Sequence, residues 1–170
     1  NNQIIVTTLE TIQDSPDMFK SLTDSVSFIF KNSNSNWVKN VALKTLTRLN
    51  PDLGRKQIKE ILIATHSPLL PSALTSLATL NQVEDWNLIL PFLKEGDPSK
   101  ISEAIELMAT LNPDQFSEEI KVSLRNLILK KDPGLVALIA ELAKQNRWKD
   151  FAKPLAQSLS SLSSEDTTES

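Results

Sequence analysis

The stretch TRLNPDLG, residues 47–54, decides the fold predicted for this chain, because its central Leu-Asn pair recurs. Leu49-Asn50, Leu80-Asn81 and Leu111-Asn112 follow one another at intervals of 31 residues. Self-similarity at a fixed interval of about 20 to 50 residues is typical of proteins that stack similar supersecondary units. We therefore expect a repeat protein.

The apolar residues around each Leu-Asn pair predict two helices per repeat. Four sites superpose when the sequence is shifted by 31 residues: Ala42, Ala73 and Ala104; Leu43, Leu74 and Ile105; Leu46, Leu77 and Met108; Leu49, Leu80 and Leu111. Their spacing follows one face of a helix. Beyond the Asn, a second helix is predicted by sites four residues apart: Ile58, Ile89 and Ile120, then Leu62, Leu93 and Leu124. Each repeat is thus expected to be an antiparallel helix pair.

The Asn-Pro-Asp sequence after Leu49 marks the point where one helix ends and the next begins. Pro51 disfavours helical backbone at Asn50, so the first helix must stop there. Asn is a favoured N-cap, Pro suits the first helical position, and the charge of Asp52 complements the helix dipole. Comparable pairs precede the first helix of later repeats, at Ser67-Pro68, Asp97-Pro98 and Asp132-Pro133.

The outer copies are less regular and align with shifts of 34 and 37 residues, as expected for terminal repeats. Five helix pairs follow from this register, at about residues 2–32, 36–65, 67–95, 98–130 and 133–162. We expect one domain over residues 1–162, because 170 residues can bury a substantial core. Residues 163–170 are rich in Ser, Thr and acids and are predicted to form a flexible tail.

The composition disfavours an enzyme and a metal or cofactor site. Cysteine is absent, which removes disulfides, thiolate ligands and thiol nucleophiles. Three glycines do not form a phosphate-binding loop, and His66, the single histidine, has no hydrolase or metal motif around it. The carboxylate pairs Glu84-Asp85 and Glu118-Glu119 are explained by helix starts, where negative charge is favourable. We expect no catalytic residue, no cofactor and no metal.

No apolar run in this chain is long enough to span a bilayer. The chain starts at Asn1 rather than Met, so we expect a piece of a longer protein, with any targeting signal outside it. A cytoplasmic location is predicted on this basis.

Charge is banded along the chain although the net charge is only −3. Residues 31–59 carry seven bases and one acid, residues 84–119 nine acids and two bases, and residues 121–153 eight bases and three acids. Such bands are usually solvated faces, and they also allow binding of nucleic acid through phosphate contacts. The slightly negative total and the few aromatic residues count against nucleic acid.

The segments NWVKNVALKTLTRLN (residues 36–50) and DPSKISEAIELMATLN (residues 97–112) resemble the first helix of HEAT-like repeats. The family pattern is matched by Asn36, Val38, Lys39, Ala42 and Leu46, whereas Pro68 and Pro71 depart from it. Tetratricopeptide repeats are the rival, but their Trp, Gly and Tyr positions are not met. The resemblance implies an all-α, right-handed α-solenoid, with the second helix of each pair lining a concave groove.

The helical register places one set of residues on the groove side of the second helices. This set is Lys56, Lys59, Trp86, Asn87, Lys94, Glu118, Lys121, Arg125 and Lys153. Trp86 is included because the apolar stripe gives it no core position, whereas Trp37 and Trp148 are interpreted as packing residues.

The sequence is compatible with three functions. The first is a protein-interaction scaffold that binds another protein, or another domain of the same protein, in the groove. The second is a structural or regulatory module of a larger protein, including one that is associated with a membrane. The third is nucleic-acid binding through the basic bands.

Overall fold

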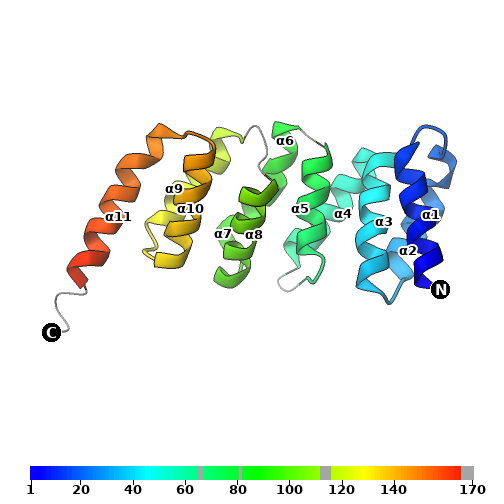
Figure 1. Cartoon of the computed structure of the whole chain (residues 1–170), viewed down its shortest axis with the longest axis horizontal. Helices are drawn as coiled ribbons and strands as arrows, with labels where there is room; N and C mark the ends of the chain where they lie inside the picture. The colour runs from blue at the N-terminus through cyan, green and yellow to red at the C-terminus, as the bar shows by residue number, and fades with distance from the viewer. Residues whose placement is uncertain (65–66, 81, 112–115, 166–170) are drawn as a thin grey trace. The chain divides into compact units, whose positions relative to one another are not determined.

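The computed structural model describes residues 1–64, 67–80, 82–111 and 116–165, and these residues form helices joined by turns, with no strand among them (Figure 1). This confirms the predicted all-α class. The chain divides into two compact units, Asn1–Ile89 (unit 1) and Leu90–Ser170 (unit 2). Asn81, Asn112 and His66, which the sequence analysis singled out, lie outside the described residues.

Unit 1 is built around helix α3, which packs against α1, α2, α4 and α5. Its elements are α1 (Asn2–Asp14), the 3₁₀ turn η1 (Lys20–Leu22), α2 (Thr23–Asn32), α3 (Asn36–Leu49), α4 (Pro51–Ile63), α5 (Leu70–Leu80), α6 (Val83–Trp86) and the 3₁₀ turn η2 (Asn87–Ile89). In Figure 1, α1, α3 and α5 lie side by side, in agreement with the contacts of α3 with the other two.

The predicted apolar stripe forms the core of unit 1. Ala42, Leu43 and Leu46 of α3 are fully buried, as are Ala73 and Leu77 of α5. The small alanines allow neighbouring helices to approach closely, and the branched side chains remove apolar surface from water.

The junction between α3 and α4 has the caps that the sequence predicted. The side-chain Oδ1 of Asn50 accepts a hydrogen bond of 3.1 Å from the backbone N–H of Leu53, and Pro51 is the first residue of α4. One residue further on, Gly54 allows a close approach of the two helices. A Cβ atom at this position would lie 2.7 Å from the Cα of Thr47.

A buried polar link joins α1 to α3. Gln13 Nε2 donates to Thr45 Oγ1 over 2.9 Å, and Arg48 donates to the carbonyl oxygen of Gln13 over 3.0 Å at the end of α1. A cation at the end of a helix is favourable because unsatisfied carbonyl groups gather there. These hydrogen bonds give the interface between α1 and α3 a polar component beside its apolar core.

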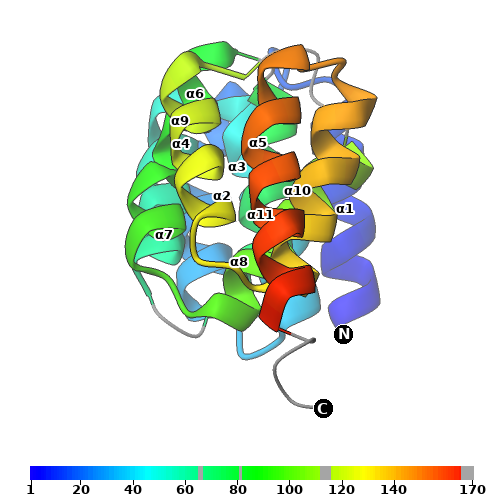
Figure 2. The same ribbon diagram turned by 90° about the vertical axis from the view of Figure 1, so that its left-hand side faces the viewer.

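Unit 2 has α9 and α10 as its central helices. Its elements are α7 (Leu90–Glu95), α8 (Pro98–Leu111), α9 (Glu118–Ile128), α10 (Pro133–Gln145), the 3₁₀ turn η3 (Lys149–Phe151) and α11 (Ala152–Glu165). Helix α10 packs on α8, α9 and α11, and α9 packs on α7 and α11. In Figure 2, α7 and α9 lie on one side of this unit and α10 lies on the other.

The caps and the core stripe of unit 2 also agree with the sequence. Asp132 Oδ1 accepts from the N–H of Leu135 over 2.9 Å, with Pro133 at the first helical position of α10. Asp97 Oδ1 accepts from the N–H of Ser99 over 2.9 Å at the start of α8. Ile105, Met108, Ile120, Leu124 and Ile139 are fully buried.

The helices differ from the prediction at three places. Helix α5 begins at Leu70 rather than at Pro68. The second helix expected in the pair at about residues 67–95 is divided into α6, η2 and α7. Pro91 explains this division, because it has no N–H to donate and its ring clashes with the carbonyl group of Asn87 in a regular helix. Helix α11 continues to Glu165, into the segment predicted as a tail, and residues 166–170 lie outside the described part.

Candidate functional site

The nine residues predicted for the groove are divided between the two units. Lys56, Lys59, Trp86 and Asn87 belong to unit 1, and Lys94, Glu118, Lys121, Arg125 and Lys153 belong to unit 2. The exposed members are Lys56, Lys59, Lys94, Glu118 and Lys153, and the half-buried members are Asn87, Lys121 and Arg125. Trp86 is the exception and is buried.

The prediction that Trp86 lies on a binding surface is wrong. Only 2% of this residue is exposed, and it is among the largest buried side chains of the chain. The prediction rested on the apolar stripe of the repeat, which gives Trp86 no core position, whereas in the structure α6 ends at Trp86 and a 3₁₀ turn follows. Because this helix is divided, the helical register taken from α4 no longer predicts the direction in which the Trp86 side chain points. Burial of the large apolar surface of an indole ring stabilises the folded protein.

Arg55, next to the exposed Lys56 of α4, makes a bidentate ion pair within unit 1. Its Nε and Nη2 atoms donate to the two carboxylate oxygens of Asp85 over 2.5 and 3.0 Å. Asp52 accepts from Nη1 over 2.9 Å. The hydrogen bonds to Asp85 raise the pKa of Arg55 above its ordinary value, against the opposing effect of desolvation. This bidentate pair ties α4 to α6.

In unit 2, an ion cluster along α9 brings together three of the predicted residues. We call Glu118, Lys121, Arg125 and Asp150 the α9 ion cluster. Arg125 donates to Glu118 Oε1 over 2.5 Å and also to Asp150, and Lys121 Nζ lies 3.8 Å from Glu118 Oε2. Both cations keep about a quarter of their side-chain surface exposed, 25% for Lys121 and 26% for Arg125.

The same two cations lie against aromatic rings that follow α10. Lys121 Nζ is 5.6 Å from the centroid of the Trp148 ring, and Arg125 Cζ is 5.4 Å from that of Phe151. Trp148 also contacts Phe116 edge-on, with ring centroids 5.5 Å apart, which agrees with its interpretation as a packing residue. These cation–π and aromatic contacts hold the segment after α10 against α9. Lys121 and Arg125 therefore have a structural role in addition to any binding role.

A surface pocket of about 350 Å³ between α7 and α9 contains one further predicted residue, Lys94, together with Glu118 of the α9 ion cluster. Its lining, which defines the α7–α9 pocket, is Leu90, Lys94, Glu118, Glu119, Val122, Ser123 and Asn126. Val122 is 44% exposed although it is apolar. Lys94 and Glu119 make no ion pair within the described ranges. The pocket thus combines an apolar wall with charged groups that a partner can reach.

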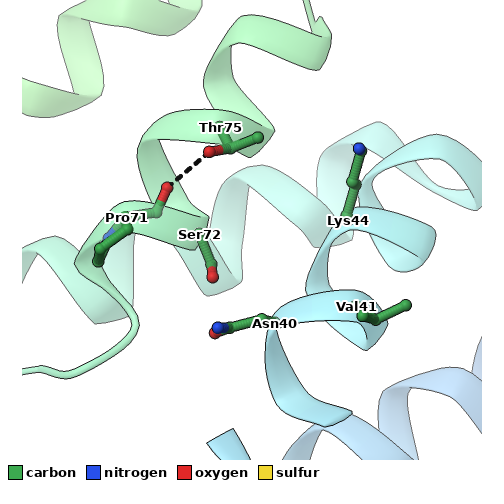
Figure 3. A pocket seen from close by; sticks show the side chains of 6 residues that line it. All are labelled: Asn40, Val41, Lys44, Pro71, Ser72 and Thr75. Carbon is green, nitrogen blue, oxygen red and sulfur yellow. Dashed lines mark hydrogen bonds between the residues drawn. The ribbon is translucent and has the colours of Figure 1, made fainter. Parts of the chain in front are cut away.

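A smaller pocket of about 210 Å³ lies in unit 1, between α3 and α5 (Figure 3). Asn40, Val41 and Lys44 line it from α3, and Pro71, Ser72 and Thr75 line it from α5. Thr75 donates to the carbonyl oxygen of Pro71 over 2.8 Å, whereas Asn40 Oδ1 is buried and has no hydrogen-bond partner among the described residues. No sequence pattern predicts this pocket, because its two walls are about one repeat apart in the chain.

The described residues contain no group of three or more His, Cys, Asp or Glu side chains that could hold a metal ion. Within the same ranges, no helix has the length and apolar character needed to cross a membrane.

Comparison of the chain with models of known families, with curated proteins and with solved structures finds no match.

Proposed function

We propose that the chain is a non-catalytic protein-interaction module built of HEAT-like helix pairs. The interval of 31 residues between Leu-Asn pairs supports this proposal. So do the contacts within each unit, where first helices pack on first helices (α1 on α3, α3 on α5, α8 on α10) and α7 packs on α9. Packing of equivalent helices from successive repeats is the basis of a solenoid, and stacked pairs offer extended binding surfaces. A right-handed α-solenoid of about five pairs is the architecture that we propose.

The α7–α9 pocket is the observation that carries the proposed function. It lies between the second helices of two successive predicted pairs, where a solenoid of this class has its binding groove. A partner that enters it buries the exposed face of Val122 and can pair with Lys94 and Glu119. Apolar anchors surrounded by polar groups are the usual arrangement of protein interfaces. Exposed Lys56 and Lys59 are the corresponding groove residues of unit 1.

Variants of the pocket must avoid the α9 ion cluster to test binding without unfolding. Reversal of Lys121 or Arg125 would break internal ion pairs and cation–π contacts. Lys94, Glu119 and Val122 are exposed and have no such contact among the described residues. The double variant Glu119→Lys/Val122→Asp is therefore the informative one. Its control is Lys31→Glu/Lys130→Glu, since both lysines are exposed and line neither of the two pockets described above.

The experiment is quantitative capture from an extract of the source cells with the wild type and both variants. A photo-crosslinking amino acid at position 122 identifies the proteins that touch the pocket. We expect at least one protein to crosslink at position 122, to be lost from the pocket variant and to be retained by the control. Equal capture by all three forms, with each folded by circular dichroism, would contradict the proposed surface.

A further inference from the structure

A second surface pocket of unit 2, with a volume of about 410 Å³, lies where α10 meets α11. Ala143 and Phe151 form its floor and are buried, and Ala140, Trp148 and Leu155 form half-buried walls. We call it the α10–α11 pocket. None of its lining residues belongs to the α7–α9 pocket, so the two surfaces can be tested separately.

The local backbone fixes the shape of this pocket. Helix α10 ends in a Schellman motif: Arg147 N–H donates to the carbonyl oxygen of Lys144 over 3.1 Å, and Trp148 N–H donates to that of Ala143 over 2.9 Å. Arg147 has the left-handed conformation that this motif requires, with φ of 56°. The chain therefore turns sharply, and Trp148 and Phe151 are positioned beside the end of α10.

The charge around the pocket is positive and only partly compensated. Lys144, Arg147 and Lys149 line it, all three are exposed, and no acidic residue is among its lining. Lys144 lies 3.4 Å from Glu141, whereas Arg147 and Lys149 make no ion pair within the described part of the chain. Asp150, the acid of the same turn, is bound by Arg125 of α9. An apolar floor is thus bordered by two cations, Arg147 and Lys149, that have no acidic partner among the described residues.

We propose that the α10–α11 pocket binds an acidic segment of a partner protein that carries an aromatic or branched aliphatic side chain between carboxylates. The apolar side chain would cover Ala143, Phe151 and Leu155, and the carboxylates would pair with Arg147 and Lys149. Burial of apolar surface supplies affinity, and complementary charge supplies specificity and a fast association rate. Both parts of the ligand are needed, because exposed ion pairs alone contribute little.

The same geometry favours a protein ligand over a nucleic acid. Binding of single strands depends on bases that stack on aromatic rings along a positive groove. The Trp148 ring already contacts Phe116, Phe151 and the ammonium group of Lys121. Trp148 is therefore a packed wall of the pocket, and it does not offer a free stacking surface for a base.

The test is a fluorescence-polarisation titration of the whole chain with three labelled probes. The first is a short peptide of Asp and Glu around one Phe and one Leu, the second has Ala at the two apolar positions, and the third is a single-stranded RNA of similar length. We expect the first peptide to bind with a Kd of about 10 to 100 μM and the second to bind at least about tenfold more weakly. The amide NMR signals that move should lie within residues 140–155.

Two variants and one control locate the binding to this pocket. Arg147→Glu/Lys149→Glu should weaken the first peptide about tenfold or more, because two attractions become repulsions. The control Lys31→Glu/Lys130→Glu has the same change in net charge and should leave the affinity within about twofold. Ala140→Phe fills the pocket from its α10 wall without changing charge and should also weaken binding about tenfold.

Four outcomes would overturn the proposal. The first is equal binding of the two peptides, and the second is binding of the RNA that is tighter than that of the first peptide and is lost in the Arg147→Glu/Lys149→Glu variant. The third is that the control variant weakens binding of the first peptide as much as Arg147→Glu/Lys149→Glu does, and the fourth is no binding of this peptide at about 1 mM. The variants must keep the circular dichroism spectrum of the wild type. If the charge-reversal variant does not fold, Ala140→Phe and the movement of NMR signals in the wild type decide the question.

Discussion

At the scale of single residues, the features that matter most are those that allow or require close approach. Gly54 is the clearest case, because its missing side chain lets the backbone of α4 approach Thr47 of α3. Thr47 is itself fixed, since it is 1% exposed and its hydroxyl group donates to the carbonyl oxygen of Leu43 over 2.8 Å. The sequence indicated only that glycine is rare in this chain and did not single out this position.

We predict that Gly54→Ala destabilises the protein although Ala is the better helix former. The added Cβ would lie 2.7 Å from the Cα of Thr47, a distance that requires a backbone shift. Overpacking of this kind costs about 1 to 3 kcal/mol, against a gain of about 1 kcal/mol in helix propensity. Urea denaturation measures the difference in the free energy of unfolding, and Gly134→Ala is the control because its nearest contact is 3.4 Å. A more stable Gly54→Ala protein would contradict the prediction, because it would show that α3 and α4 can move apart without a loss of stability.

At the scale of helices, the bidentate contact between Arg55 and Asp85 determines how α4 and α6 are joined. Asp85 is 5% exposed, so its carboxylate depends on Arg55 for compensation. On the sequence alone, Asp85 is explained by the helix dipole, and no local pattern connects it with Arg55. The two residues are 30 positions apart, and only the tertiary structure brings them together.

We predict that Arg55→Met destabilises unit 1 by about 3 kcal/mol, because it leaves a buried carboxylate without its partner. The double variant Arg55→Met/Asp85→Leu should recover most of this loss, since an apolar pair of similar volume replaces the buried charges. A double-mutant cycle by thermal or urea denaturation, completed with Asp85→Leu, measures the coupling free energy. If the effects of the two substitutions on the free energy of unfolding are additive, the coupling free energy is zero and the ion pair does not contribute to stability.

At the scale of the whole molecule, the chain is organised as two compact units, Asn1–Ile89 and Leu90–Ser170. In each of them the most extensive contacts join helices that are neighbours or next neighbours along the chain. Proteins with this pattern have a stability that is approximately the sum of local terms, so that damage to one region need not spread to another.

We predict that Leu46→Ala, a cavity substitution in the core of unit 1, accelerates amide hydrogen exchange in α1, α3 and α5 much more than in α8, α9 and α10. Leu46 is fully buried, and its truncation should cost about 2 to 5 kcal/mol. Leu142→Ala, at a fully buried position of unit 2, is the matched variant and should give the reverse pattern. Mass spectrometry of exchanged peptides measures both. Equal acceleration throughout the chain in either variant would show that the two units unfold together.

Most of the helix boundaries and of the core could be predicted because they depend on residues close in sequence. The spacing of apolar sites placed Ala42, Leu46 and Ile120 in the core, and the Asn50-Pro51 pair placed the junction of α3 and α4. The division of the helix at residues 83–95 was missed although its cause, Pro91, is local. Lys94 and Glu118, both predicted for the groove, do line one pocket.

The sequence by itself determined that this chain is helical, where α4, α8 and α10 are capped and which faces of the helices are apolar, because these properties follow from interactions within a few residues. Only the tertiary structure decided that Trp86 is buried, that Arg55 binds Asp85, and that Arg125 joins Glu118 to Asp150. A periodic pattern gives the side of a helix on which a residue lies. Pairing of charges and rings across helices depends on the distance and angle between those helices. That distance and angle are determined by the packing of all the side chains together.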